Sequence, residues 1–218
     1  MDFTFDVLLS FCIIIPVIIG FARFSKINRA YYPFIFCILL GLVNEVLSYC
    51  LVLSGHYNTV NCNIFMLLES LLLLWQFKNW GLFQKNKILL PVIVAVLVST
   101  WVLENFIFFK ITHYSSYFLI TYSFLISFMS ISIINRLIIT ERKRLVKNPT
   151  FILCVAFVMY YMFSVLSEAF WIYGLNEKQD FSGKIHRISI LTNFIAILFY
   201  TVAILWMPSK QKFTLPSS

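Results

Sequence analysis

Charged residues are scarce in this sequence. Asp, Glu, Lys and Arg together make up 12% of the 218 residues, whereas a soluble domain carries about 25%. Hydrophobic residues make up 61%, against roughly 45–50% in a soluble domain. No long polar stretch interrupts them, so we expect no separate soluble domain. The composition therefore predicts a protein that contacts the lipid bilayer, because water-covered folds cannot hide this much apolar surface.

Patterns that bind metals are also missing. The five cysteines include no CxxC pair, and His56, His113 and His186 lie far apart at predicted loops or helix ends. We therefore expect neither a zinc site nor a cofactor. Cys50 and Cys62 flank one predicted loop and could form a disulfide, although two free thiols suit their apolar surroundings better.

The net charge of +8 does not indicate a nucleic-acid partner. The basic residues lie in short loops between apolar runs, where membrane topology requires them. The N-terminal sequence MDFTFDV holds two acids and no basic residue, so we do not expect a cleavable signal peptide. We expect the first apolar run to remain as a helix.

Seven apolar runs are long enough for spanning helices, and they do not alternate as membrane strands do. Pro16 lies inside the first run and should kink it. The predicted fold class is an all-α, polytopic membrane bundle of seven helices that forms a single transmembrane domain, with residues 208–218 as a short tail. The predicted spans are residues 6–23, 33–54, 60–77, 88–109, 115–135, 150–173 and 187–207.

The basic residues are unevenly divided between the two sets of loops. Thirteen of the 17 Lys and Arg residues follow the odd-numbered spans, and four lie in the other loops. Because positive loops face the cytoplasm, the sequence predicts an external N-terminus and a cytoplasmic C-terminus. The expected location is the plasma (inner) membrane.

Two parts of the sequence resemble each other. The second run, which begins YYPFIFCILLG, and the sixth, which begins NPTFILCVAF, both place a Cys shortly after a Pro. The third run ends LLLLWQFKN and the seventh VAILWMPSK, each with a Trp near its end. The pattern suggests a parallel 3+1+3 repeat, which is common in transporters. The alternative is that apolar helices resemble one another through composition alone.

Several polar residues lie inside the predicted spans, where a charge costs about 2.5–3.5 kcal/mol. Glu69 falls near the middle of its span, and Glu45 lies slightly outward of the middle. Further members fall in the outer half, among them Glu104, Asn61 and Asn63. This distribution predicts a polar cavity that is open to the outside and closed toward the cytoplasm. The alternative is that these residues join helices by hydrogen bonds.

Helical spacing extends the set. Tyr161 and Ser164 share a stripe with Glu168, and Asn193 shares one with His186, at steps of three, four or seven residues. His186 and Arg187 would stand at the outer mouth as counter-charges. The predicted ligand- or proton-binding cavity comprises Asn44, Glu45, Glu69, Tyr161, Ser164, Glu168, Asn193, His186 and Arg187.

The fifth loop is strongly basic. It is expected to contact anionic lipid or a partner protein, although control of topology alone would explain its charge. The residues concerned are Arg136, Arg142, Lys143, Arg144 and Lys147.

The sequence lacks the signatures of three seven-helix families. The last run holds no Lys for a retinal Schiff base, the spans hold no zinc-binding histidines, and the Pro-Gln signature of 3+1+3 sugar transporters is missing. The segments NIFMLLESLLLLWQFKNW and ILTNFIAILFYTVAILWMPSK, which contain Glu69 and Asn193, resemble a group of uncharacterised bacterial seven-helix membrane proteins of similar length. Some members of that group lie beside two-component histidine kinases, so the resemblance implies a sensory role but no particular ligand.

The first hypothesis is a receptor or sensor whose outward acidic cavity binds a small ligand, proton or cation and which signals through a separate cytoplasmic partner. The alternative is a small-solute or ion transporter or channel, including a membrane-permeabilising effector, that uses the same carboxylates. A third hypothesis, an intramembrane lipid enzyme, lacks a nucleophile–base pair, so an enzyme is not expected. A homo-oligomer is compatible with all three.

Overall fold

The computed structural model describes residues 3–140, 145–173 and 179–209, and its secondary structure over these residues is helical apart from one isolated bridge, between Ile27 and Ser209. The α-helices are α1 (Phe3–Phe11), α2 (Ile14–Ala22), α3 (Tyr32–Leu53), α4 (Thr59–Asn79), α5 (Leu89–Val102), α6 (Ser116–Thr140), α7 (Pro149–Ile172) and α8 (Gln179–Trp206). Three short helices are η1 (Arg29–Tyr31), η2 (Leu103–Phe108), a π-helix that continues α5, and η3 (Leu145–Lys147).

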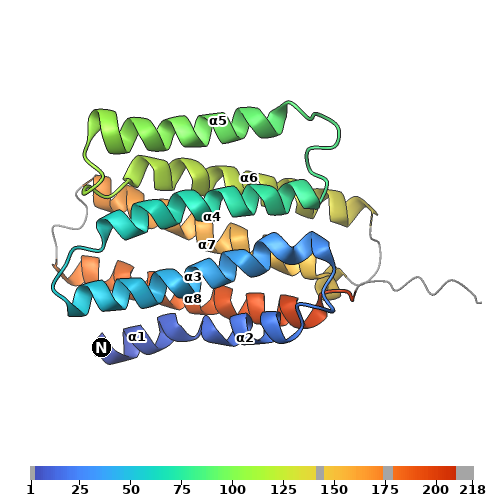
Figure 1. The fold of residues 1–218 in the computed structure, drawn as a ribbon, viewed down its shortest axis with the longest axis horizontal. Coiled ribbons are helices and arrows are strands. Elements are labelled where there is room, and N and C mark those ends of the chain that lie inside the picture. Colours follow the sequence, from blue (N-terminus) through green and yellow to red (C-terminus); the bar gives the residue numbers. More distant parts are fainter. Residues whose placement is uncertain (1–2, 141–144, 174–178, 210–218) are drawn as a thin grey trace, which may run out of the picture.

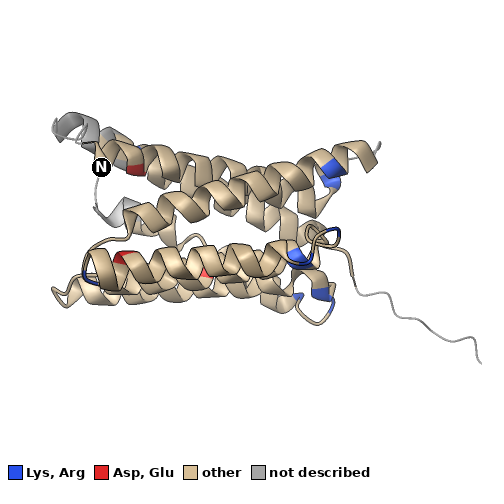
Figure 2. Ribbon diagram, turned by 90° about the horizontal axis from the view of Figure 1, so that it is seen from above, with Lys and Arg blue, Asp and Glu red and all other residues tan. Residues whose placement is uncertain are grey.

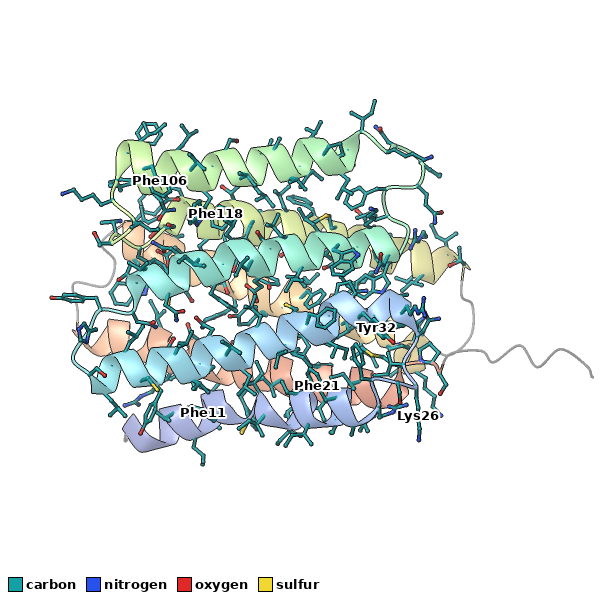
Figure 3. The ribbon with its side chains drawn as sticks, in the orientation of Figure 1. Phe11, Phe21, Lys26, Tyr32, Phe106 and Phe118 are labelled. Carbon is teal, nitrogen blue, oxygen red and sulfur yellow. The ribbon has the colours of Figure 1, made fainter. Side chains whose placement is uncertain are left out.

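Within the part of the chain that the structure describes, six helical segments are long and apolar enough to cross a membrane, and a shorter apolar segment, Val7–Ala22, precedes them. Large apolar side chains cover the outside of the bundle: Phe106 is 63% exposed and points outward, whereas Phe118 is fully buried (Figure 3). Such an apolar exterior is stable only against lipid. The chain is therefore an α-helical bundle of the multi-pass membrane class, as its composition predicted.

The first apolar segment breaks between α1 and α2. Pro16 has no N–H to donate to the carbonyl of Cys12, and this carbonyl instead accepts a bond from the Ile15 N–H at 3.0 Å. The break at Cys12–Ile13 thus lies one turn before the proline that was expected to kink the helix. Gly41 of α3 permits close contact here, because an added Cβ would lie 2.8 Å from Ile13 Cδ1.

Two helices extend beyond their predicted spans. α6 continues to Thr140 rather than ending near residue 135, and α8 begins at Gln179 rather than near residue 187. Both extensions contain polar residues, which a helix outside the bilayer core tolerates but which a search for apolar runs does not include.

The helix neighbours follow a paired pattern. α3 packs against α2 and α4, and α7 packs against α6 and α8. α2 also contacts α8, and α6 contacts α4, so the two sets of helices are joined side by side (Figure 1). α5 lies at one edge of the bundle, against α4 and α6. Along α6, the small buried residues Ser123, Ser127 and Ser130 permit close packing of neighbouring helices.

Most of the described basic residues gather at one end of the bundle, which we call the basic end (Figure 2). There, the Arg23 guanidinium donates to the carbonyls of Ile204 and Leu205 at 2.5 and 2.6 Å, at the end of α8. The Arg136 guanidinium donates to the carbonyls of Trp80 and Gly81 at 2.5 and 3.1 Å, at the end of α4. Each arginine therefore satisfies carbonyls that a helix C-terminus leaves open, and its charge suits that end of the helix dipole.

Candidate functional site

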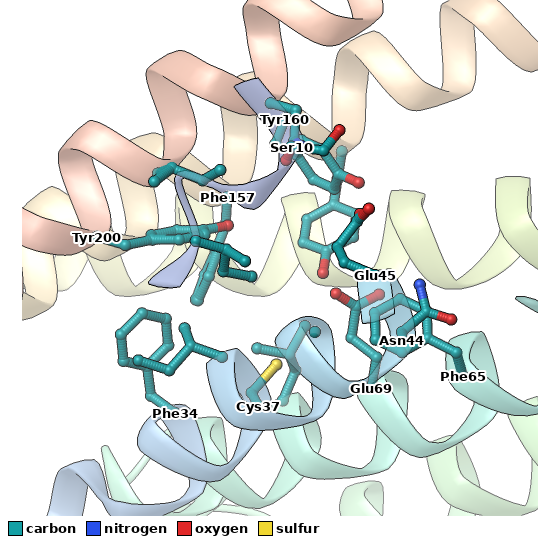
Figure 4. Close-up of a pocket in the computed structure, with 17 residues that line it drawn as sticks. Ser10, Phe34, Cys37, Asn44, Glu45, Phe65, Glu69, Phe157, Tyr160 and Tyr200 are labelled. Atoms are coloured by element: carbon teal, nitrogen blue, oxygen red, sulfur yellow. The ribbon is translucent and has the colours of Figure 1, made fainter. Parts of the chain in front are cut away.

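A cavity of about 150 Å³ lies in the middle of the bundle, between the first apolar segment and helices α3, α4, α7 and α8 (Figure 4). Five of the nine residues predicted for the binding cavity line it, namely Asn44, Glu45, Glu69, Tyr161 and Asn193. The break between α1 and α2 adjoins the same cavity through Ser10 and Ile13. Polar groups from five parts of the chain thus face one space.

Glu69 is held from two sides. The Tyr122 hydroxyl on α6 donates to Glu69 Oε2 at 3.1 Å, and the Tyr161 hydroxyl on α7 approaches the same carboxyl group. Glu69 is half-buried on α4. Its position is therefore set by two neighbouring helices, while its carboxyl group still faces the cavity.

Glu45 and Asn193 retain most of their hydrogen-bonding capacity. Within the described part of the chain, neither the Glu45 carboxyl nor the Asn193 carboxamide has a hydrogen-bond partner, although both line the cavity. Asn44 is partly used, because its Oδ1 accepts a bond from Asn61 Nδ2 at 2.9 Å. An acidic cavity with unsatisfied acceptors can receive a hydrogen-bond donor or a positive charge.

Aromatic side chains close the cavity toward the basic end, and we call them the aromatic layer. Ring centroids lie 5.2 Å apart for Phe34 and Tyr200, and 5.9 Å apart for Phe157 and Tyr200. Phe34, Phe77 and Phe157 are at most 1% exposed. The layer consists of Phe34, Phe77, Trp80, Phe157 and Tyr200.

The other predicted cavity residues lie elsewhere. Ser164 lines a second pocket of about 220 Å³ between α7 and α8, which shares the lining residues Tyr160 and Asn193 with the central cavity. Glu168 is buried beside Ser116, at the start of α6. Arg187 is exposed and does not line the central cavity, and the side chain of His186 lies outside the described residues.

Asn63, Asn105 and Ser115 form a second polar cluster, which we call the polar clamp. Asn63 Nδ2 donates to Asn105 Oδ1 at 3.0 Å and to the carbonyls of Ile111 and His113 at 3.0 and 2.7 Å. Asn63 Oδ1 accepts from the Ser115 N–H at 3.1 Å, and Ser115 Oγ donates to Asn105 Oδ1 at 3.0 Å. The clamp fastens the connection between η2 and α6 to α4, so its polar groups are already satisfied.

Glu104 also has a structural partner. Its two carboxylate oxygens accept the backbone N–H groups of Tyr117 and Phe118 at 3.0 and 2.6 Å. These N–H groups belong to the first turn of α6, where a negative charge is stabilised by the helix dipole. Glu104 therefore caps α6 instead of facing the central cavity.

The predicted basic loop is described only in part. Arg136 is bound to the end of α4, and Lys147 is exposed in η3. Arg142, Lys143 and Arg144 lie outside the described residues. All five cysteines are free thiols, so Cys50 and Cys62 form no disulfide in this structure.

Some cavity residues were not anticipated from the sequence. Tyr122 binds Glu69 from α6, and Ser10, Cys37 and Tyr160 line the cavity. Tyr160 and Tyr161 are adjacent, so either could have been chosen from the sequence. Nothing in the sequence indicated that α6 brings Tyr122 to α4, because the sequence does not state which helices are neighbours.

No family model, curated protein or solved structure matches the chain. The site must therefore be interpreted from its own chemistry. Among the described residues, no three His, Cys, Asp or Glu side chains lie close enough to hold a metal ion. What the cavity offers instead is a pair of carboxyl groups, two carboxamides and several phenol hydroxyls around a small, partly open space.

Proposed function

We propose that the protein is a receptor-like membrane protein whose central cavity binds a small cationic or hydrogen-bond-donating ligand, such as a short amine. The observation that carries this proposal is the unused hydrogen-bonding capacity of Glu45 and Asn193 beside Glu69. Polar groups in a membrane interior are costly and are commonly retained for function. A cavity of about 150 Å³ holds a molecule of roughly the size of benzene, which limits the ligand to a few heavy atoms.

The charge distribution supports a cytoplasmic basic end and an external N-terminus. In this orientation, the aromatic layer separates the cavity from the cytoplasm, and ligands arrive from the outer side. A receptor of this kind passes its signal to a separate cytoplasmic partner, and the basic loops between the helices are the surface available to that partner.

Binding can be tested on protein reconstituted in nanodiscs of neutral lipid. Isothermal titration with a series of primary amines and with Na⁺ and K⁺ should detect a ligand whose affinity falls at least tenfold in Glu69→Gln and in Glu45→Gln. Glu104→Gln is the matched control, because Glu104 is also an intramembrane acid but caps α6. Equal affinity in all four proteins would contradict the proposal.

Transport is a second candidate, and the paired packing of the helices favours it. In this comparison α2, α3 and α4 are equivalent to α6, α7 and α8. The contacts α2–α3, α3–α4 and α2–α8 then have the counterparts α6–α7, α7–α8 and α6–α4. Arg23 follows the first apolar segment and binds the end of α8, as Arg136 near the end of α6 binds the end of α4. These correspondences support a parallel 3+1+3 repeat, and a broken helix beside a midplane cavity is typical of transporters.

Flux measurements in sealed proteoliposomes separate the two candidates. A receptor should bind the ligand and leave proton and amine gradients intact. A transporter should dissipate them, and Glu69→Gln should abolish the flux. Flux that persists unchanged in Glu69→Gln and Glu45→Gln would rule out transport through this cavity.

A further inference from the structure

A third pocket, lined partly by basic residues, lies at the basic end and is distinct from the central cavity. It has a volume of about 440 Å³. Its lining includes Trp80, Arg136, Lys147, Thr150 and Trp206, which come from the ends of α4, α6 and α8, from η3 and from the start of α7. Trp80 belongs also to the aromatic layer and packs against Phe157, which lines the central cavity.

The charge of this pocket is positive and uncompensated within the described part of the chain. Arg136 and Lys147 line it, and no described carboxylate forms an ion pair with either. The Arg136 guanidinium is already fixed by the carbonyls of Trp80 and Gly81. A guanidinium carries five N–H donors, so these two bonds leave others for a ligand while holding the group in place.

The other polar groups of the pocket also favour a ligand that accepts hydrogen bonds. The indole N–H of Trp80 is buried and has no acceptor within the described residues. The Asn148 side-chain oxygen already accepts the N–H groups of Thr150 and Phe151, so it is engaged in capping α7. The lining therefore presents donors and cations, and the acceptors near it are engaged.

We propose that this pocket binds a phosphate group. Phosphate combines negative charge with several acceptor oxygens, which matches a fixed guanidinium and an ammonium group. Two sources supply this chemistry at the end of a membrane helix bundle: the headgroup of an anionic lipid and a free phosphate compound. Trp206 is 42% exposed at the pocket edge, and exposed Trp residues commonly mark the level of the lipid headgroups.

The test uses the full chain in nanodiscs. The lipid arm compares phosphatidylcholine discs with discs that also hold phosphatidylglycerol, and native mass spectrometry counts the retained anionic lipid. The phosphate arm titrates inorganic phosphate against protein in neutral detergent and follows Trp fluorescence. Retention of phosphatidylglycerol identifies the lipid source, saturable binding of phosphate identifies the free source, and binding of neither overturns the proposal.

Three variants make the result specific. Lys147→Gln should weaken binding about fivefold, the effect of one basic residue on an anionic lipid. Trp80→Phe replaces the indole by a smaller aromatic ring without an N–H, which changes the pocket wall, and it should weaken binding by a smaller factor. Lys85→Gln is the matched control, because Lys85 is an exposed basic residue that does not line the pocket. If Lys147→Gln and Lys85→Gln lower the affinity equally, general surface charge explains the binding, and the proposal of a specific phosphate pocket is overturned.

Discussion

The polar clamp and the central cavity contain similar residues but use them differently. In the clamp, the Asn63 side chain makes four hydrogen bonds, all to groups of the protein. In the cavity, Glu45 and Asn193 have no hydrogen-bond partner among the described residues. Both clusters lie in predicted spans, and a count of polar residues in the sequence cannot distinguish them.

The difference teaches that free polar groups which face a cavity, and not polarity alone, separate a binding site from a structural polar cluster. Glu45 and Asn193 are only half-buried and line the cavity, so their free groups are accessible to a ligand. The clamp stabilises a loop and needs no ligand. The cavity gains its missing partners when a ligand binds, which is why we place function there. Changes in one cluster should therefore affect stability, and changes in the other should affect binding.

The largest expected effect is on the clamp. Asn63→Leu removes the hydrogen bonds of the Asn63 side chain and leaves the Ser115 N–H and two carbonyls without their partner, while Asn105 Oδ1 keeps only its bond from Ser115 Oγ. We expect the free energy of unfolding to fall by about 3–4 kcal/mol. Unfolding can be followed through the reaction of the buried thiols of Cys37 and Cys154 with a fluorescent maleimide.

All variants for this measurement carry Ser in place of Cys12, Cys50 and Cys62. These three thiols are not fully buried and would react before the protein unfolds. Ile64→Leu is a suitable control, since Ile64 is the neighbouring residue on α4 and is 43% exposed. A clamp variant as stable as this control would show that the cluster does not hold the loop, and the contrast between the two clusters would fail.

A smaller loss is expected at the cap of α6. In the parent protein the Glu104 carboxylate accepts hydrogen bonds from two backbone N–H groups. Glu104→Gln removes the negative charge and places an amide NH₂, which cannot accept, opposite one of them. The loss of stability should be about 2 kcal/mol. Amide hydrogen exchange of the first turn of α6 should increase in the variant, while exchange in α8 stays the same. Unchanged protection at Tyr117 and Phe118 would contradict the capping role.

Apolar patterning in the sequence was sufficient to predict a helical membrane bundle, because a long apolar run in lipid satisfies its own backbone only as a helix. Pro16 likewise predicted the weak point of the first segment, since proline removes a specific hydrogen bond. The last residue of α6 and the first residue of α8 were harder to predict from the sequence, because polar turns extend both helices beyond their apolar runs.

The candidate site was predictable only in part. Depth and helical spacing assigned Glu45, Glu69 and Asn193 to one predicted cavity, and all three line the central cavity of the structure. The same reasoning placed Glu168 with them, but Glu168, on α7, lies beside Ser116 at the start of α6 and does not line the cavity. Partners such as the carbonyls of Ile111 and His113 could not be foreseen, because they belong to a connection whose path depends on the assembled bundle.

The smallest effect on stability is expected in the cavity itself. Glu45 has no hydrogen-bond partner among the described residues, so Glu45→Gln removes an acidic group from the membrane interior without breaking a contact. Such a group is costly in lipid, and sites kept for function are often not optimal for stability. We therefore expect the variant to be as stable as the parent, or more stable by up to about 1 kcal/mol, in the same maleimide assay. A loss as large as that of Asn63→Leu would mean that Glu45 holds the bundle together and that the cavity is a structural cluster like the clamp.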